Sequence, residues 1–194
     1  IGDCPFCGRT GKFSIVVQTG VWRCFVCNEG EDTGKAVRGG NVFVFLRKLW
    51  DYSAKATKDC SDLVESRGYL SDEALIHWEV VKSFLTGNWL VPGYNAEGHL
   101  NQLYKYNGKI LYATAGLGQQ LHGVNLYVAE KPILYLCEGP WDGIALWEAL
   151  RNCKEVNGRL VPTASANNSL LAESNVLAVP GCGTFLESWL PLFK

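Results

Sequence analysis

The sequence predicts a chain of mixed α+β and α/β class, with a β-rich zinc ribbon first, a mixed α+β middle and a partial α/β sheet last. Three observations predict this order. Two Cys-x-x-Cys pairs stand at the start, Cys4 with Cys7 and Cys24 with Cys27. Strand-like segments separated by turn residues fill the middle of the chain. Near its end, an apolar strand runs into a tight turn and a helix.

The composition is that of an ordered protein that does not enter a membrane. Of the 194 residues, 47% are hydrophobic and 19% are charged, which excludes a disordered chain. No apolar run approaches the roughly 20 residues needed to cross a bilayer, and the N-terminus has no signal-peptide pattern. Four cysteines outside the two pairs are scattered, which favours a reducing compartment. We therefore expect a cytoplasmic location and no membrane partner.

The two cysteine pairs have the spacing of a four-thiolate zinc site. Sixteen residues separate Cys7 from Cys24, within the range of structural zinc sites. Residues 13–25 read as two strands and a short turn, and such a hairpin returns the second pair to the first. A redox pair or two disulfides is the alternative. One structural zinc ion is expected on four thiolates, those of Cys4, Cys7, Cys24 and Cys27.

Basic and aromatic residues on this hairpin suggest contact with a nucleic acid. A single strand offers phosphates to cations and bases to aromatic rings. Residues 1–50 carry seven Lys or Arg against four acidic residues, a small positive surplus. The candidates for nucleic-acid binding here are Lys12, Trp22 and Arg23. The alternative for Trp22 is that it packs the core of the zinc module.

The segment that follows predicts short helices and a boundary. An apolar helix is expected from Val42 to Trp50. Residues 51–60 are polar and are expected to form a linker. A helical stretch follows near Ser61–Glu65, and Ser71 has the character of a helix N-cap.

Strand-like segments between residues 89 and 114 predict a small antiparallel sheet. The dipeptide Asn107-Gly108 between alternating segments is a strong hairpin signal. Lys105 and Lys109 lie among tyrosines in this region and are candidates for nucleic-acid binding. The alternative is a half-exposed sheet with solvated lysines.

A carboxylate stands where an apolar strand ends. Residues 132–137 are continuously apolar, as in a buried parallel strand, and Glu138 follows directly. Ligands gather beyond the carboxyl ends of strands in an open α/β sheet, and a carboxylate there can hold magnesium. Asp142, in the first turn of the next helix, is either a second ligand or a residue that only favours the helix dipole.

The rest of the chain predicts little further structure. Residues 152–175 are polar and mixed, and we expect a helix tail and a loop. A second apolar strand is predicted at residues 176–179, followed by a short helix-like segment.

The order of these features resembles the DnaG-type DNA primases of bacteria and phages. The zinc ribbon with Gly40-Asn41-Val42 looks like their N-terminal template-reading module. The start of their RNA polymerase domain is similar to three parts of this chain: Arg67-Gly68, the stretch from Trp89 to Tyr106, and Leu121-His122-Gly123-Val124. Glu138-Gly139-x-x-Asp142 resembles the first acidic motif of the TOPRIM fold, and Gly183-Thr184 looks like the ending of its second strand.

The resemblance implies an enzyme and its domains. The enzyme is a DNA primase, a nucleotidyltransferase that makes short RNA primers on single-stranded DNA from ribonucleoside triphosphates in a bacterial or phage-infected cell. A replicative helicase, fused or separate, is the implied partner. Four segments follow: a zinc-ribbon template-recognition domain at 1–50, a linker at 51–60, the N-terminal subdomain of the primase RNA polymerase core at 61–130 and a partial TOPRIM subdomain at 131–194.

The resemblance also implies roles for single residues. Glu138 is the first magnesium ligand and a catalytic carboxylate, with Asp142 as its companion. Arg67 and Lys105 are candidates for contact with phosphate. All of these roles belong to primer synthesis as the family performs it.

The chain departs from the family pattern in one respect. The second acidic motif, Asp-x-Asp, is missing, because no aspartate follows Asp142. A magnesium site built on one strand end is incomplete, so we expect a fragment that does not synthesise primers by itself. Two other interpretations stay open: a non-catalytic, zinc-dependent module that binds single-stranded DNA in replication, and another TOPRIM enzyme, a topoisomerase or nuclease.

Overall fold

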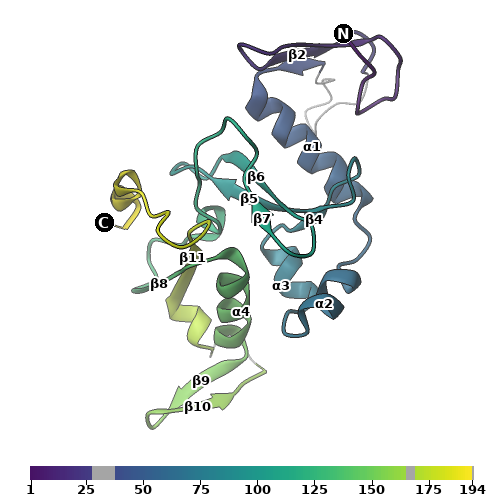
Figure 1. Cartoon of the computed structure of the whole chain (residues 1–194). Coiled ribbons are helices and arrows are strands. Elements are labelled where there is room, and N and C mark those ends of the chain that lie inside the picture. Colours follow the sequence, from purple (N-terminus) through teal and green to yellow (C-terminus); the bar gives the residue numbers. More distant parts are fainter. Residues whose placement is uncertain (28–37, 165–168, 194) are drawn as a thin grey trace. The chain divides into compact units, whose positions relative to one another are not determined.

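The computed structural model describes residues 1–27, 38–164 and 169–193 (Figure 1). Its class is mixed α+β, as predicted. The chain divides into two compact units. One comprises residues 1–58 with 81–88, and the other comprises residues 59–80 with 89–194.

The first unit contains a three-stranded antiparallel sheet and a long helix. The strands are β1 (Phe13–Val16), β2 (Val21–Cys24) and β3 (Gly39–Gly40), in that spatial order. Helix α1 (Val42–Ala56) follows, and the short strand β4 (Val81–Lys82) packs against it. None of the helices in the described part of the chain combines the length and the apolar composition that spanning a bilayer requires.

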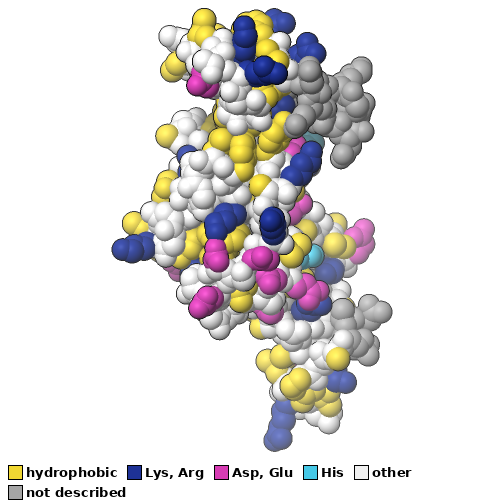
Figure 2. Space-filling view, turned by 90° about the vertical axis from the view of Figure 1, so that its right-hand side faces the viewer, with side chains coloured by type: hydrophobic (Ala, Val, Ile, Leu, Met, Phe, Trp, Pro, Cys, Tyr) yellow, Lys and Arg dark blue, Asp and Glu magenta, His cyan; other side chains and the backbone are white. Residues whose placement is uncertain are grey.

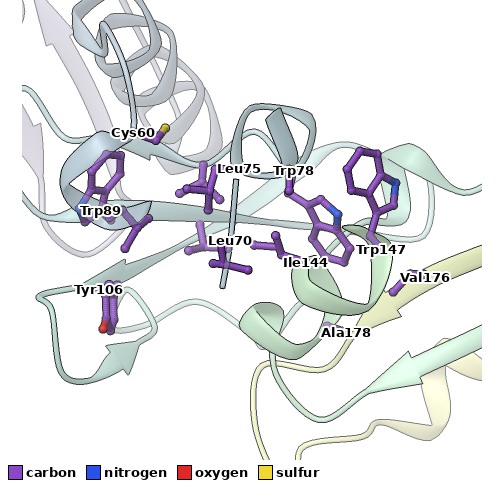
Figure 3. Close-up of a cluster of buried hydrophobic side chains, with 14 of the residues drawn as sticks. Cys60, Leu70, Leu75, Trp78, Trp89, Tyr106, Ile144, Trp147, Val176 and Ala178 are labelled. Carbon is purple, nitrogen blue, oxygen red and sulfur yellow. The ribbon is translucent and has the colours of Figure 1, made fainter. Parts of the chain in front are cut away.

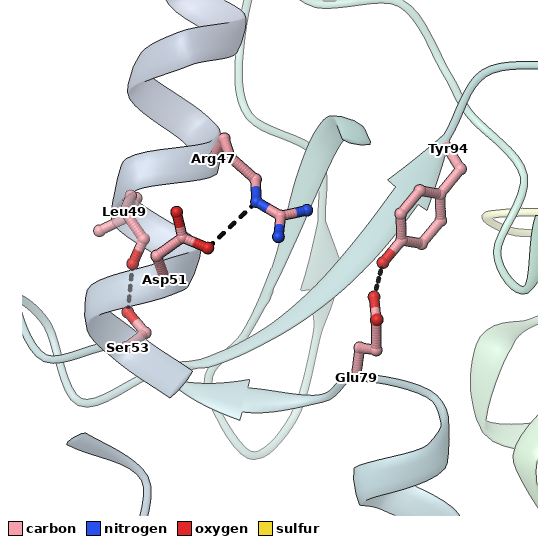
Figure 4. A network of polar contacts seen from close by, with 6 residues as sticks. All are labelled: Arg47, Leu49, Asp51, Ser53, Glu79 and Tyr94. Atoms are coloured by element: carbon pink, nitrogen blue, oxygen red, sulfur yellow. Dashed lines mark hydrogen bonds and ion pairs between the residues drawn. The ribbon is translucent and has the colours of Figure 1, made fainter. Parts of the chain in front are cut away.

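Helix α1 continues through the first part of the segment 51–60 that was predicted as a linker. Its polar residues are used in packing, which explains the difference. Ser53 is fully buried, and its hydroxyl donates to the carbonyl of Leu49 at 2.8 Å (Figure 4). The backbone N–H of Lys82 donates to the hydroxyl of Thr57 at 2.9 Å. The bond to Thr57 thus holds β4 against the end of α1, although Lys82 lies 25 positions after Thr57 in the sequence.

The second unit is built from three helices and three small sheets among its described residues. Its helices are α2 (Ser61–Arg67), α3 (Asp72–His77) and α4 (Pro140–Arg151). Antiparallel pairing joins β5 (Trp89–Tyr94), β6 (Leu100–Tyr106) and β7 (Leu111–Tyr112). Strands β8 (Ile133–Cys137) and β11 (Ser174–Ala178) are parallel. Strands β9 (Cys153–Val156) and β10 (Arg159–Pro162) form a hairpin. Short 3-10 turns complete the unit at Val124–Leu126, Leu170–Glu173 and Glu187–Phe193.

Several predicted features of this unit are confirmed. The Ser71 hydroxyl accepts the N–H of Ala74 at 3.2 Å and caps α3. The strand, tight turn and helix around Glu138 are present as β8 and α4. The interval 152–175 was predicted wrongly, because it contains the hairpin β9–β10. Asn157 and Gly158 both have positive φ at its turn, the geometry of a type I′ turn.

Leu121 and His122 join the antiparallel sheet to the parallel pair. The N–H of Tyr94, at the end of β5, donates to the carbonyl of Leu121 at 2.8 Å. The N–H of His122 donates to the carbonyl of Ala178, at the end of β11, at 2.9 Å. The segment that resembles a primase motif therefore connects the two sheets of this unit.

The core of the second unit gathers around Trp78. Figure 3 shows Trp78 beside Ile144 of α4, with Leu75 and Leu70 in the same cluster. Gly143 permits this packing, since a Cβ there would lie 2.8 Å from the Trp78 ring and 3.1 Å from the Cβ of Ala178. A helix with a larger residue at this position could not approach Trp78 as closely.

Strand β8 is less buried than its sequence predicted. It is parallel to β11, as expected, but Ile133, Tyr135 and Leu136 are 39%, 37% and 44% exposed. The two strands form a two-stranded sheet. Strand β11 is buried along its whole length because α4 and the turn at Leu170–Glu173 pack against it and His122 bonds to Ala178 at its end, whereas fewer of the described elements cover β8. An apolar run therefore marked the strand correctly but not its degree of burial.

His122 makes the second unit sensitive to acid. It is completely buried, and its Nδ1 lies 2.7 Å from the carbonyl of Pro92, while Nε2 has no hydrogen-bond partner among the described residues. Burial lowers the pKa of His122 from its usual 6.5 to about 4. The folded state therefore holds its neutral form, which donates from Nδ1 to Pro92.

We expect stability to fall as the pH drops from about 6.5 towards 4, because the unfolded chain then takes up a proton at His122 that the folded chain refuses. The loss from this one group is roughly 2–3 kcal/mol between pH 7 and pH 4.5. Denaturant unfolding of the wild type and His122→Gln at both pH values measures it, since glutamine does not titrate. His99→Gln, at an exposed histidine, is the matched control. Equal pH dependence in wild type and His122→Gln would contradict the assignment.

Candidate functional site

The four paired cysteines converge on one point. Their sulfur atoms all lie within 4.8 Å of one another. The Sγ atoms of Cys4 and Cys27 are 3.6 Å apart, and those of Cys7 and Cys24 are 3.8 Å apart. A tetrahedral zinc ion with Zn–S bonds of about 2.3 Å needs sulfur atoms about 3.8 Å apart, whereas a disulfide needs about 2.0 Å. The cluster therefore suits a structural zinc ion and not two disulfides.

Burial and mutual proximity shift the pKa values of these thiols in different directions. Burial raises the pKa of the Cys4 and Cys27 thiols. Burial acts in the same direction on Cys24, but the N–H groups of Val26 and Cys27 and the neighbouring thiols outweigh it and lower the pKa of Cys24 to about 7. Four thiolates this close repel one another, and a divalent cation removes that repulsion.

A cluster of aromatic rings lies between the cysteine-bearing segments and helix α1. Trp22 is 1% exposed, and its ring packs against Phe6, Phe13 and Phe45 at centroid distances of 5.6, 5.8 and 5.6 Å. Its indole N–H donates to the carbonyl of Asn41 at 3.1 Å. This placement decides between the two interpretations of Trp22, because no face of its ring is left for a base. Trp22 packs the core of the module.

Asn41 connects this cluster to α1. Its side chain accepts the N–H of Val44 at 3.1 Å and caps the helix, as asparagine does at many helix starts. Gly40 precedes it, and a Cβ at Gly40 would lie 2.8 Å from the side chain of Val44. The Gly40-Asn41-Val42 motif therefore has a structural role. It lets the chain turn from β3 into α1 at the residue whose carbonyl accepts the Trp22 indole N–H.

The opposite face of the hairpin carries cationic and apolar side chains. Along β2, Trp22 and Cys24 point to the core, and Arg23 alternates with them and is exposed. The Arg23 guanidinium lies 5.2 Å from the ring centroid of Phe25, which is 55% exposed. The N–H of Phe25 donates to the carbonyl of Lys12, itself exposed, at 3.0 Å. Lys12 and Arg23 thus share one exposed face with Phe25, whose ring could stack on a base or pack the core by its sequence and is exposed in the structure.

Glu138 directly follows β8 and Asp142 lies in the first turn of α4, and both are exposed. Gly139 is the N-cap of α4 and Pro140 its first residue, an arrangement that proline favours. A Cβ at Gly139 would lie 3.5 Å from an oxygen of Asp142. Burial raises the pKa of the Cys137 thiol, and the nearby charge of Asp142 adds to the effect. Asp142 therefore turns back towards the strand end.

The two carboxylates do not by themselves make a metal centre. Among residues 1–27, 38–164 and 169–193, a group of three or more possible metal ligands occurs only at the cysteines. Glu138 and Asp142 supply at most part of a magnesium site, which usually takes one or two carboxylates together with waters and phosphate oxygens. A role for them in binding magnesium stays a prediction.

The two lysines of the middle sheet differ in surroundings. Lys105 lies on β6 between Leu90 of β5 and Tyr112 of β7 and is half-buried. Lys109 follows the Asn107-Gly108 turn and is exposed. Most neighbouring tyrosines are unavailable to a ligand, since Tyr104 and Tyr106 are 2% and 5% exposed. Basic side chains are scattered over the face drawn in Figure 2, without one continuous patch.

Arg67 lies against two aromatic rings that contact each other and that the sequence did not connect with it. Its guanidinium carbon is 4.6 Å from the ring centroid of Tyr106 and 4.4 Å from that of Trp141. Each ring adjoins a predicted site residue in the chain, Tyr106 next to Lys105 and Trp141 next to Asp142. The sequence shows this adjacency, but no rule of residue spacing predicts that Arg67, Tyr106 and Trp141 lie close together in the fold.

No known protein family matches this chain, and neither does any curated protein.

Proposed function

We propose that this chain is part of a DNA primase, in which the zinc module binds the single-stranded template and the second unit carries nucleotide-binding residues and the first magnesium ligand. One observation carries the proposal. The four-thiolate cluster adjoins the β1–β2 hairpin. On the exposed face of this hairpin the Arg23 guanidinium lies over the Phe25 ring, and Lys12 is paired with Phe25 through a backbone hydrogen bond. Cations beside an exposed ring suit a strand that offers both phosphates and unpaired bases.

The second unit supplies the other half of the proposal. Glu138 stands at the carboxyl end of a parallel strand and Asp142 in the first turn of the next helix. In the proposed reaction these carboxylates hold magnesium, which stabilises the charge on the transferring phosphoryl group. Arg67 and Lys105 would contact phosphate. The resemblance to DnaG-type primases connects these residues with a template-reading ribbon.

Binding of a fluorescein-labelled oligothymidylate, followed by fluorescence anisotropy, tests the template part. Arg23→Gln is expected to weaken binding about 3- to 10-fold and to lower the salt dependence by about one phosphate contact, because the guanidinium is exposed on the hairpin face. Arg159→Gln, at an exposed arginine of β10, controls for the lost charge. Equal losses in both variants would contradict a specific role of the hairpin face.

Template-directed incorporation of ribonucleotides tests the enzymatic part. The assay requires a polypeptide that carries this chain together with the family's second acidic motif. Glu138→Gln is expected to abolish incorporation while leaving oligothymidylate binding intact, because the amide keeps the size of the side chain and loses its charge. Full activity of Glu138→Gln would remove the carboxylate from the mechanism.

A zinc-dependent binding module without catalysis is the second candidate. It is favoured by the finding that, within the described ranges, potential metal ligands cluster in threes or more only at the cysteines. It predicts the same effect of Arg23→Gln on strand binding and no ribonucleotide incorporation in the extended polypeptide. The two assays together therefore separate the candidates.

A further inference from the structure

Two aromatic rings hold the side chain of Arg67 in place. Arg67 ends helix α2, Tyr106 ends strand β6 and Trp141 lies in the first turn of α4. The guanidinium lies over both rings, at 4.6 and 4.4 Å from their centroids, and the two ring centroids are 4.9 Å apart. Elements from three places in the chain thus converge on one cation.

Where the structure describes the chain, the charge of Arg67 is not matched by a carboxylate. No Asp or Glu of the described residues forms an ion pair with it. Its Nε atom is buried without a hydrogen-bond partner in that part of the chain, and one terminal nitrogen donates to the hydroxyl of Tyr69 at 3.2 Å. Within the described residues, the ring faces of Tyr106 and Trp141 and the hydroxyl of Tyr69 are therefore the partners of this cation.

Ring faces hold a guanidinium without using its hydrogen-bond donors. The attraction comes from the quadrupole of the ring, which leaves the N–H groups at the guanidinium edge to bind an acceptor. Stacking also removes most of the rotamers of a long side chain, so less entropy is lost when a ligand binds. A planar fork of fixed orientation matches two oxygens of a phosphate group.

We propose that Tyr106 and Trp141 are positioning residues that preorganise Arg67 to receive a phosphate group, either of a nucleoside triphosphate or of a DNA strand. This inference rests on the proposed function and goes further, because it assigns a role to two aromatic residues that touch no ligand themselves. Trp141 directly precedes Asp142, and Tyr106 directly follows Lys105. We call Tyr106 and Trp141 the clamp. Its two rings stand on β6 and α4, the elements that also carry the predicted phosphate-binding residue Lys105 and the predicted catalytic residue Asp142.

A double-mutant cycle between Trp141 and Arg67 tests the proposal. The variants are Trp141→Leu, Arg67→Gln and their combination, measured with two probes, a fluorescent ATP analogue and the labelled oligothymidylate. We expect Trp141→Leu to weaken binding about fivefold in the wild type and to have no further effect in Arg67→Gln, because a clamp acts only through the residue it holds. Trp141→Phe and Tyr106→Phe keep a ring and are expected to bind within about twofold of the wild type.

The outcomes separate the two proposals. Coupling seen with either probe supports the clamp and identifies the source of the phosphate. Binding of a probe with purely additive effects overturns the clamp and leaves the proposed function standing. If the wild type binds neither probe, the proposed function fails together with the clamp.

A second measurement serves if Trp141→Leu does not fold. The Nε–H of Arg67 is buried, and its guanidinium lies over the rings of Tyr106 and Trp141. Its NMR resonance in the wild type is therefore expected upfield of ordinary arginines and protected from exchange. Its absence in Arg67→Lys assigns it. We expect this resonance to move on addition of ATP or of oligothymidylate. A resonance that is unshifted, or that neither probe moves, contradicts the clamp.

Discussion

Cys27→Ser is expected to unfold the first unit at neutral pH. Cys27 is 1% exposed, and its sulfur lies 3.6 Å from that of Cys4 at the centre of the cluster. Binding of zinc to such thiolates contributes about 10–16 kcal/mol in small zinc modules, as much as the whole net stability of a typical domain, about 5–15 kcal/mol. The indole N–H resonance of Trp22 reports the loss, because its bond to Asn41 exists only in the folded unit.

The same loss is expected when a strong chelator removes zinc from the wild type, and added zinc should restore the resonance. Cys182→Ser is the matched control, since Cys182 is an exposed free thiol of the second unit. It should keep one zinc ion per chain and the native spectrum. A Cys27→Ser protein with one bound zinc ion and an unchanged Trp22 resonance would show that the cluster does not hold the metal.

Short-range patterns explain what could be predicted from the sequence. The two cysteine pairs, the hairpin between them and the Ser71 cap each depend on residues close together in the chain. Asn157-Gly158 is the same kind of short-range signal and indicates the turn of the hairpin β9–β10. Strand alternation could also have placed Trp22, since it points to the same side of β2 as Cys24, and the cysteine must face the metal site.

Long-range packing explains what the sequence could not indicate. The segment 81–88 belongs to the first unit because backbone groups of β4 and its neighbours bond to hydroxyls of α1. The exposure of β8 depends on which elements cover it, and its apolar composition carries no such information. The ring pair around Arg67 likewise comes from three elements whose meeting no local pattern encodes.

Gln102 shows how a single buried side chain can take the place of a strand. It is completely buried on β6. Its amide nitrogen donates to the carbonyls of Thr114 and Gly118 at 3.3 and 3.4 Å, and its amide oxygen accepts the N–H of Thr114 at 3.2 Å. The hydroxyl of Thr114 donates in turn to the carbonyl of Leu103 at 2.8 Å. The irregular segment after β7 is thus held on the sheet by side-chain bonds.

Gln102→Leu is expected to lower the free energy of unfolding by roughly 1–3 kcal/mol, because leucine fills the space but leaves the partly buried backbone groups of Thr114 without their partner. Denaturant unfolding measures the loss, and faster hydrogen exchange at Thr114 locates it. Gln119→Leu, at an exposed glutamine of the same segment, should change stability by less than about 0.5 kcal/mol. Equal stability of the two variants would show that the hydrogen bonds of Gln102 do not hold the segment between Tyr112 and Leu121 on the sheet. Apolar packing would then have to hold it.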